Sequence, residues 1–240
     1  MKTFQTTLAL LTLLLSGSLL VAAGPYPDPL FNRDQIRVAK PTLDSINIQN
    51  LPLEDYPLLS KFSGLKQIWL SRGEGTLATD EKLEALATLN FTNLTHVNLN
   101  NSRLITNRGI KALSKIQSLK QLMLKGTAIT DEACDVMASQ MSLTAVQVDN
   151  CPAITKKGLE VLARSKTLDY FGFSSDRLTQ EEVLALANSF NNITWYEIID
   201  GQRKLDRDAI KALSTKTDIH VMEIVWVDPT GAPGLKQLKP

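Results

Sequence analysis

The chain has 240 residues, of which 43% are hydrophobic and 21% are charged, and its formal net charge is +1. This composition is typical of a globular protein and excludes a largely disordered one. The near-neutral charge also disfavours a nucleic acid or an anionic membrane as the partner, because either would require a strongly basic surface.

Residues 1–23 have the features of a secretory signal peptide. Lys2 supplies a positive start, an apolar run follows, and small residues precede a cleavage point after Ala23. An uncleaved anchor is the alternative, but the apolar run is shorter than the roughly 20 residues that cross a bilayer, and Gly17 interrupts it. We therefore expect a secreted or periplasmic protein. Loss of Lys2 leaves 25 basic and 25 acidic side chains, and no other segment could span a membrane.

Residues 24–42 contain three prolines ahead of an apolar segment and are expected to form an N-terminal cap. Residues 43–228 form an array of about eight repeats. Each repeat starts with an apolar residue, a second apolar residue follows three places later, and a third follows two places after that. The starts of successive repeats lie 22 to 29 residues apart. These starting residues are Leu43, Leu65, Leu94, Leu119, Leu143, Leu168, Ile193 and Ile219.

The second half of each repeat predicts a helix with a side-chain cap. The expected cap residues are Thr79, Thr106, Thr130, Thr155, Thr179 and Asp206. Glu182 is placed to complete a capping box with Thr179. Small residues recur three places after a cap, at Gly109, Ala133, Gly158 and Ala209, and we expect them to let the helix approach the sheet closely.

The segment from Leu119 to Asp131 and its equivalents resemble leucine-rich repeats of the helix-containing class of about 25 residues, close to the cysteine-containing and ribonuclease-inhibitor types. The resemblance implies an α/β solenoid, a curved horseshoe with parallel strands on its concave side and helices on its convex side. It also implies that ligands bind the concave face. The chain has neither the four-cysteine caps nor the F-box segment of well-known eukaryotic members, which favours a bacterial exported protein.

Cys134 and Cys151 align with apolar or small positions of other repeats, so we interpret them as buried structural thiols. Export would permit one disulfide between them, and that is the alternative. Residues 229–240 contain two glycines and three prolines and are expected to form a flexible C-terminal tail.

No arrangement of residues predicts catalysis, a metal site or a cofactor site. The two histidines, His96 and His220, lie in distant repeats, and the chain lacks an HExxH pair, a GxSxG elbow, a P-loop and a CxxC motif. Carboxylates such as Glu181 fall in first helical turns, where the helix dipole stabilises negative charge. The sequence therefore favours a protein that is not an enzyme.

Strand residues that alternate with the core positions should face the concave surface. The predicted partner-binding residues are Gln67, Trp69, His96, Asn98, Met123, Gln147, Tyr170, Trp195, Glu197 and Glu223. Trp69, Tyr170 and Trp195 are expected to be exposed, and exposed aromatic residues with a polar rim are typical of binding hot spots. Alternatively, these rings fold over a neighbouring strand or pack against the tail.

The sequence thus predicts an exported binding module that recognises a protein partner, or a glycan, through its concave face. An inhibitor or an accessory subunit of an exported enzyme is the alternative, and an unorthodox enzyme comes third. Asn90, Asn93, Asn100 and Asn192 lie in glycosylation sequons, which matter only in a eukaryotic secretory route.

Overall fold

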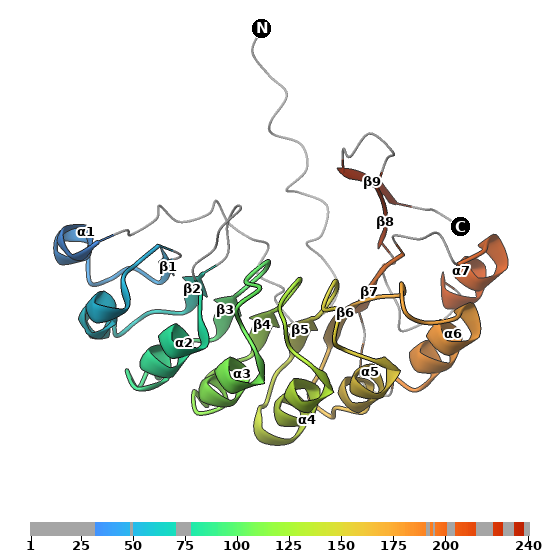
Figure 1. Ribbon diagram of the computed structural model, residues 1–240, viewed down its shortest axis with the longest axis horizontal. Coiled ribbons are helices and arrows are strands. Elements are labelled where there is room, and N and C mark those ends of the chain that lie inside the picture. The colour runs from blue at the N-terminus through green and yellow to red at the C-terminus, as the bar shows by residue number, and fades with distance from the viewer. Residues whose placement is uncertain are drawn as a thin grey trace, which may run out of the picture.

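The computed structural model describes residues 32–48, 50–70, 78–190, 193, 195–200, 205–214, 223–227 and 233–237. The signal peptide predicted at residues 1–23 lies outside these ranges. Figure 1 shows one curved layer of strands with one layer of helices on its outer side. The strands of the main sheet are β1 (Ser45–Asn47), β2 (Gln67–Trp69), β3 (His96–Asn98), β4 (Gln121–Met123), β5 (Ala145–Gln147), β6 (Tyr170–Ser174) and β7 (Trp195–Ile199).

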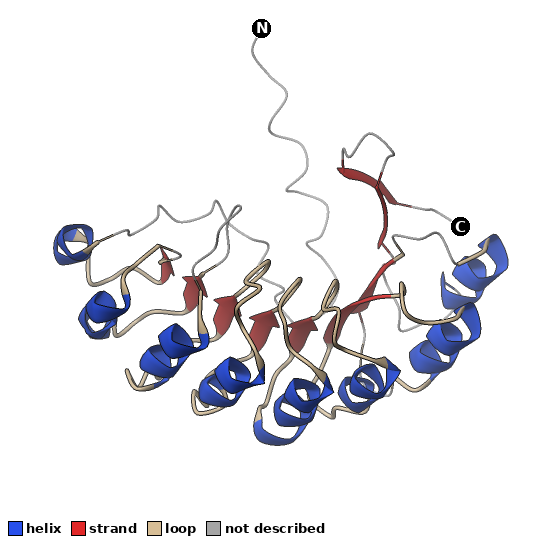
Figure 2. Ribbon diagram, viewed as in Figure 1, coloured by secondary structure: helices blue, strands red, loops and turns tan. Residues whose placement is uncertain are grey.

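These seven strands are parallel and follow one another in chain order across the sheet. A helical segment follows each strand on the convex side, as Figure 2 shows in blue against the red strands. These segments are η1 (Leu53–Lys61, a 3-10 helix), α2 (Asp80–Ala87), α3 (Asn107–Leu113), α4 (Asp131–Gln140), α5 (Lys156–Ala163), α6 (Gln180–Asn188) and α7 (Arg207–Ser214). The fold is therefore the predicted α/β solenoid.

The core runs through the array as rows of aliphatic and aromatic side chains in register. One row joins the central residues of successive strands, and all of its members are almost completely buried: Ile46, Ile68, Val97, Leu122, Val146, Phe171 and Tyr196. A single repeat of this size cannot offset the conformational entropy lost on ordering it, so burial between neighbours stabilises the array as a unit.

The predicted helix caps are confirmed. The hydroxyl of Thr79 accepts the backbone N–H of Lys82, and the other threonine caps accept an N–H of the first turn in the same way. Thr179 and Glu182 form the expected capping box. Asp206 accepts the N–H of Ala209 at 2.8 Å.

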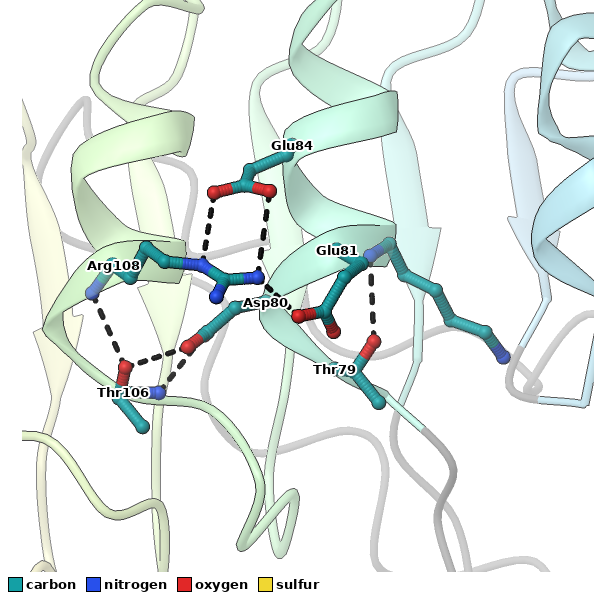
Figure 3. A network of polar contacts seen from close by, with 7 residues as sticks. Thr79, Asp80, Glu81, Glu84, Thr106 and Arg108 are labelled. Carbon is teal, nitrogen blue, oxygen red and sulfur yellow. Dashed lines mark hydrogen bonds and ion pairs between the residues drawn. The ribbon is translucent and has the colours of Figure 1, made fainter.

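A second set of hydrogen bonds joins the start of one helix to the cap of the next helix at four junctions between α2 and α7, and we call each of them an inter-repeat tie. The Asp80 carboxylate accepts both the N–H and the hydroxyl of Thr106, at 3.0 and 2.6 Å (Figure 3). Asp131 holds Thr155 in the same manner, at 2.8 and 2.6 Å. Each carboxylate thus satisfies two donors of the following repeat.

Two other ties use a carboxamide in place of the carboxylate. The Asn107 side chain accepts the N–H of Thr130 at 2.9 Å and donates to its hydroxyl at 2.8 Å. Gln180 accepts the N–H of Asp206 at 2.8 Å and donates to the Asp206 carboxylate at 3.0 Å. The amide is suited to this task because it carries both a donor and an acceptor.

The residue three places after the cap depends on the kind of tie: it is glycine where the tie is a carboxylate and alanine where the tie is an amide. A Cβ added to Gly109 would lie 2.5 Å from Oδ1 of Asp80, and one added to Gly158 would lie 2.3 Å from Oδ1 of Asp131. The two glycines therefore make room for the start of the preceding helix, and for them our expectation of a close approach to the sheet is wrong.

Among the junctions between α2 and α7, the described residues of the α5–α6 junction lack this tie. The first residue of α5 is Lys156, which cannot accept a hydrogen bond, and its ammonium instead lies 3.3 Å from Oε1 of Glu182. Glu182 itself accepts the N–H of Thr179 at 2.9 Å, within its own repeat. The α5–α6 junction is consequently held by an ion pair at the surface and by no tie of the kind found elsewhere.

Cys134 and Cys151 are buried and unbonded, which confirms their interpretation as structural thiols. The Cys151 thiol donates to the carbonyl of Leu124 at 3.1 Å and lies 3.4 Å from the hydroxyl of Thr127. Ser175 extends this polar row by donating to the Asp200 carboxylate at 2.7 Å. These small polar groups satisfy backbone groups where the strands end.

The two ends of the array differ from its middle. Within the predicted cap, α1 (Arg33–Val38) buries Ile36 and packs beside η1. At the other end, β8 (Glu223–Val227) does not join the parallel sheet as an eighth repeat but pairs antiparallel with β9 (Pro233–Gln237). Residues 219–222, which begin the predicted eighth repeat, lie outside the described ranges. β9 falls within residues 229–240, for which we predicted a flexible tail, and the short connection between β8 and β9 suits antiparallel strands.

Candidate binding face

The concave face consists of two rows of side chains set by the strand register. The first row contains Ser45, Gln67, His96, Gln121, Ala145, Tyr170 and Trp195. The second row contains Asn47, Trp69, Asn98, Met123, Gln147, Gly172 and Glu197. We refer to these rows together as the concave face. The register brings nine of the ten predicted residues together here, whereas Glu223 lies on β8, outside the parallel sheet.

Two of the aromatic residues expected to be exposed on this face are buried. Trp69 has 4% and Tyr170 has 7% of its surface exposed, so that prediction is wrong for both. Trp69 stacks on His96 of the next strand, with ring centroids 5.7 Å apart and planes at 24°. The rings lie across the sheet and shield one another, which removes apolar surface from water. The side chain of Trp195 lies outside what the structure describes.

The Tyr170 ring occupies space left by Gly172, which has no side chain in the second row. A Cβ added to Gly172 would lie 3.2 Å from the Tyr170 hydroxyl and 3.0 Å from Cγ of Gln147, so the absent side chain leaves room for the ring. The Tyr170 hydroxyl donates to Oε2 of Glu197 at 2.7 Å. Gly172 was not among the predicted binding residues, although its place between Phe171 and Phe173 marks it as a concave position.

His96 and Gln121 form the polar centre of the face. Nδ1 of His96 lies 2.9 Å from Oε1 of Gln121, an acceptor, so Nδ1 carries the proton in this arrangement. Burial lowers the pKa of His96, and the hydrogen bond to Gln121 opposes this in part. We therefore assign His96 as the neutral imidazole at neutral pH. Gln121 was not among the predicted binding residues.

The concave face carries very little charge. Among its described side chains Glu197 is the only one with a formal charge at neutral pH, and it accepts the Tyr170 hydroxyl. Carboxamides are frequent instead, and Gln67, Gln121 and Gln147 are partly exposed, as is Met123. A partner that places charged groups here would lose their hydration without gaining an opposite charge. The face is thus suited to uncharged polar and apolar groups.

The described residues include no cluster of three or more His, Cys, Asp or Glu side chains that could hold a metal ion. The network around Arg108, Glu81 and Glu84 in Figure 3 lies on the convex helices and links α2 to α3. No described helix combines the length and hydropathy that crossing a bilayer requires.

Together the parallel open sheet, the stacked aliphatic rows and the helical return segments define a solenoid built from repeats. Residues 92–114 match the family model described as "Leucine Rich repeat". That segment contains β3 and the whole of α3, and the same strand–helix unit recurs along the sheet. Comparison with curated protein sequences returns no match.

Solved structures of leucine-rich-repeat proteins resemble this one in part. A leucine-rich-repeat-containing protein of Legionella pneumophila has 14% identity and a TM-score of 0.47, with 77% of each chain covered. Actin-binding site 2 of leiomodin-1 has 22% identity and a TM-score of 0.44, covering 57% of this chain and 87% of that one. A leucine-rich-repeat protein of Leptospira interrogans has 12% identity and a TM-score of 0.30, covering 84% and 65%. At these values the conclusions rest on the chain's own geometry.

Proposed function

We propose that this chain is an exported, non-catalytic binding module that recognises a protein partner through its concave face. The observation that supports this most directly is the face itself: two rows of aligned side chains, nearly free of charge, with partly exposed carboxamides and Met123 between buried aromatic rings. Amide groups pair well with peptide groups because both offer a donor and an acceptor. Buried rings next to polar groups hold such a surface rigid, which reduces the entropy lost on binding.

A photo-crosslinking experiment in the native host tests this proposal. A benzophenone amino acid replaces Met123 on the concave face, and in a control protein it replaces Lys111, which is exposed on α3 on the convex side. We expect a discrete crosslinked species from Met123 and none from Lys111. Gln147→Arg, which adds a charge beside Met123, should remove that species. Equal crosslinking from both positions, or none from Met123, would contradict the proposal.

The neutral face also predicts how the interaction responds to salt. Exposed ion pairs weaken as ionic strength rises, whereas apolar and amide contacts change little. Once the crosslinked partner is identified, its dissociation constant should vary by less than roughly threefold between about 0.05 and 0.5 M salt. A steep loss of affinity with salt would show that charged surfaces outside the concave face dominate. If the species crosslinked to Met123 is a glycan, the partner is a glycan and not the protein that we propose.

Export forms a separate part of the proposal and rests on residues 1–23. The mature protein recovered from the host should begin at Gly24. N-terminal sequencing measures this directly. A chain that retains its first 23 residues in the cytoplasm would refute export but would leave the binding face untouched.

A further inference from the structure

A cavity of about 310 Å³ lies between the loops that follow β5 and β6, away from the rows of the concave face. Its apolar part consists of aliphatic side chains from these two repeats, namely Val148, Ile154, Leu159 and Leu178. Lys156 and Arg177 also line it. Aliphatic walls beside cationic groups are a combination that could hold an amphipathic ligand.

The cavity coincides with the junction that lacks an inter-repeat tie. At the preceding junction Asp131 draws Thr155 towards the start of α4, at 2.8 and 2.6 Å. At this junction Lys156 has no acceptor for Thr179, and the cap is satisfied within its own repeat by Glu182. The two segments are joined where the N–H of Asn150 donates to Oγ of Ser174 at 2.8 Å, but not at the helix starts, and the space between them stays open.

The two cationic side chains that line the cavity differ in whether they already form ion pairs with carboxylates. The Lys156 ammonium lies 3.3 Å from Glu182 and 3.9 Å from Glu160. Arg177 is exposed, and among the described residues it has neither an ion pair nor a hydrogen bond from its side chain. Asp176 also lines the cavity and opposes an anion there. Arg177 is thus the group best placed to bind a negatively charged ligand.

We propose that this cavity binds a carboxylate attached to a short branched aliphatic chain. The aliphatic chain contacts Ile154, Leu159 and Leu178, and the carboxylate accepts hydrogen bonds from the guanidinium of Arg177, whose planar fork matches a carboxylate. The cavity lies at the lower end of the roughly 300 to 1,000 Å³ range of small-molecule sites, which favours a ligand of a few carbon atoms. A free branched-chain acid and the C-terminal residue of a peptide both carry this chemistry.

Methyl NMR on the whole mature chain tests the site. The probes are 3-methylbutanoate, acetyl-alanyl-leucine with a free carboxylate, and the same peptide with a C-terminal amide. We expect either or both carboxylates to shift the methyl signals of Val148, Ile154, Leu159 and Leu178 at millimolar concentration, with no shift at Ile110 or Leu113 of α3. Shifts from 3-methylbutanoate would identify a free acid as sufficient, and shifts from the peptide acid alone would identify a peptide terminus.

Three variants sharpen the test. Arg177→Gln should weaken binding roughly tenfold or more, because a charged hydrogen bond is lost. Arg103→Gln, which removes an exposed arginine from the equivalent loop of an earlier repeat, should leave binding unchanged. Lys156→Asn combined with Glu182→Ala recreates the tie made by Asn107, Thr130 and Ala133, and it should close the cavity and abolish the shifts while the chain stays folded.

Two results would overturn the proposal. The first is the absence of shifts at the cavity methyls with either carboxylate. The second is equal binding of the peptide amide and the peptide acid, or equal binding by Arg177→Gln and the parent chain. Neither result bears on the concave face, because the cavity and the face share no residue.

Discussion

Gly109→Ala should lower the free energy of unfolding, although alanine is the better helix former. In a helix interior alanine is favoured over glycine by about 1 kcal/mol. Here the added Cβ would lie 2.5 Å from Oδ1 of Asp80 and 2.8 Å from Cδ1 of Leu83. Asp80 is buried, so its carboxylate cannot move aside without giving up its hydrogen bonds to Thr106.

The magnitude follows from these opposing contributions. A hydrogen bond to a charged group contributes about 1.5 to 3 kcal/mol, and overpacking a filled site costs about 1 to 3 kcal/mol. After the gain in helix propensity, we expect a net loss of about 2 kcal/mol, which corresponds to a fall in melting temperature of roughly 4 to 8 °C for a protein of this size. Urea unfolding monitored by circular dichroism measures the change.

Two companion variants separate the tie from general effects of the substitution. Gly64→Ala is the control, because a Cβ there meets nothing within 4 Å, and it should change stability by no more than about 0.5 kcal/mol. Asp80→Asn in the Gly109→Ala background recreates the amide tie seen at Asn107 and Ala133 and should recover most of the loss. Our reasoning fails if Gly109→Ala is neutral or stabilising, or if the added Asp80→Asn change restores nothing.

Three further predictions concern the concave face and the thiols. Tyr170→Ala should destabilise the fold by about 3 to 5 kcal/mol. Tyr170→Phe keeps the buried ring and loses only the hydrogen bond to the Glu197 carboxylate, so it should cost about 1.5 to 3 kcal/mol. Equal losses for the two variants in thermal unfolding would contradict the observed burial. Burial lowers the pKa of His96 in the folded chain below its usual 6.5, so as the pH falls the unfolded chain takes up the proton first. The contribution of His96 to the free energy of unfolding should therefore be fully present above about pH 6.5 and be lost progressively as the pH falls towards the folded pKa. Stability measured from pH 8 to 5 should therefore decline more steeply in the parent than in His96→Gln, and parallel curves would speak against this. Burial raises the pKa of the Cys134 and Cys151 thiols, so neither should react with a thiol reagent at pH 8 until the chain is denatured, and rapid modification of the native protein would be inconsistent with their position.

The sequence predicts the solenoid well because its core depends on local regularity. The spacing of Leu119, Leu122 and Leu124 fixes which side chains point inwards, and Thr130 or Thr179 fixes where a helix begins. Both features are properties of a few neighbouring residues, and strand alternation then identifies the opposite face without further information.

What the sequence could not predict depends on contacts between repeats. Trp69 and His96 are distant in the chain, and their stacking requires the register that pairs β2 with β3. Alternation assigns a face to Trp69 but not the direction in which the ring lies on it. The pairing of β8 was missed for a related reason: Ile224 fits the strand pattern, but no capped helix follows it to build the convex side of another repeat.

The inter-repeat ties also determine which shortened forms of this chain can fold. Where a tie is made, the helix start is matched to the repeat that follows it: a carboxylate is paired with glycine and an amide with alanine. The tied junctions are therefore not interchangeable. Deleting the single repeat that contains α3 would set Asp80 against Thr130 and Ala133, a mismatched joint. Deleting the repeats of α3 and α4 together would set Asp80 against Thr155 and Gly158, the combination that already serves Asp131. In this part of the array, loss or gain of repeats should therefore be tolerated in pairs.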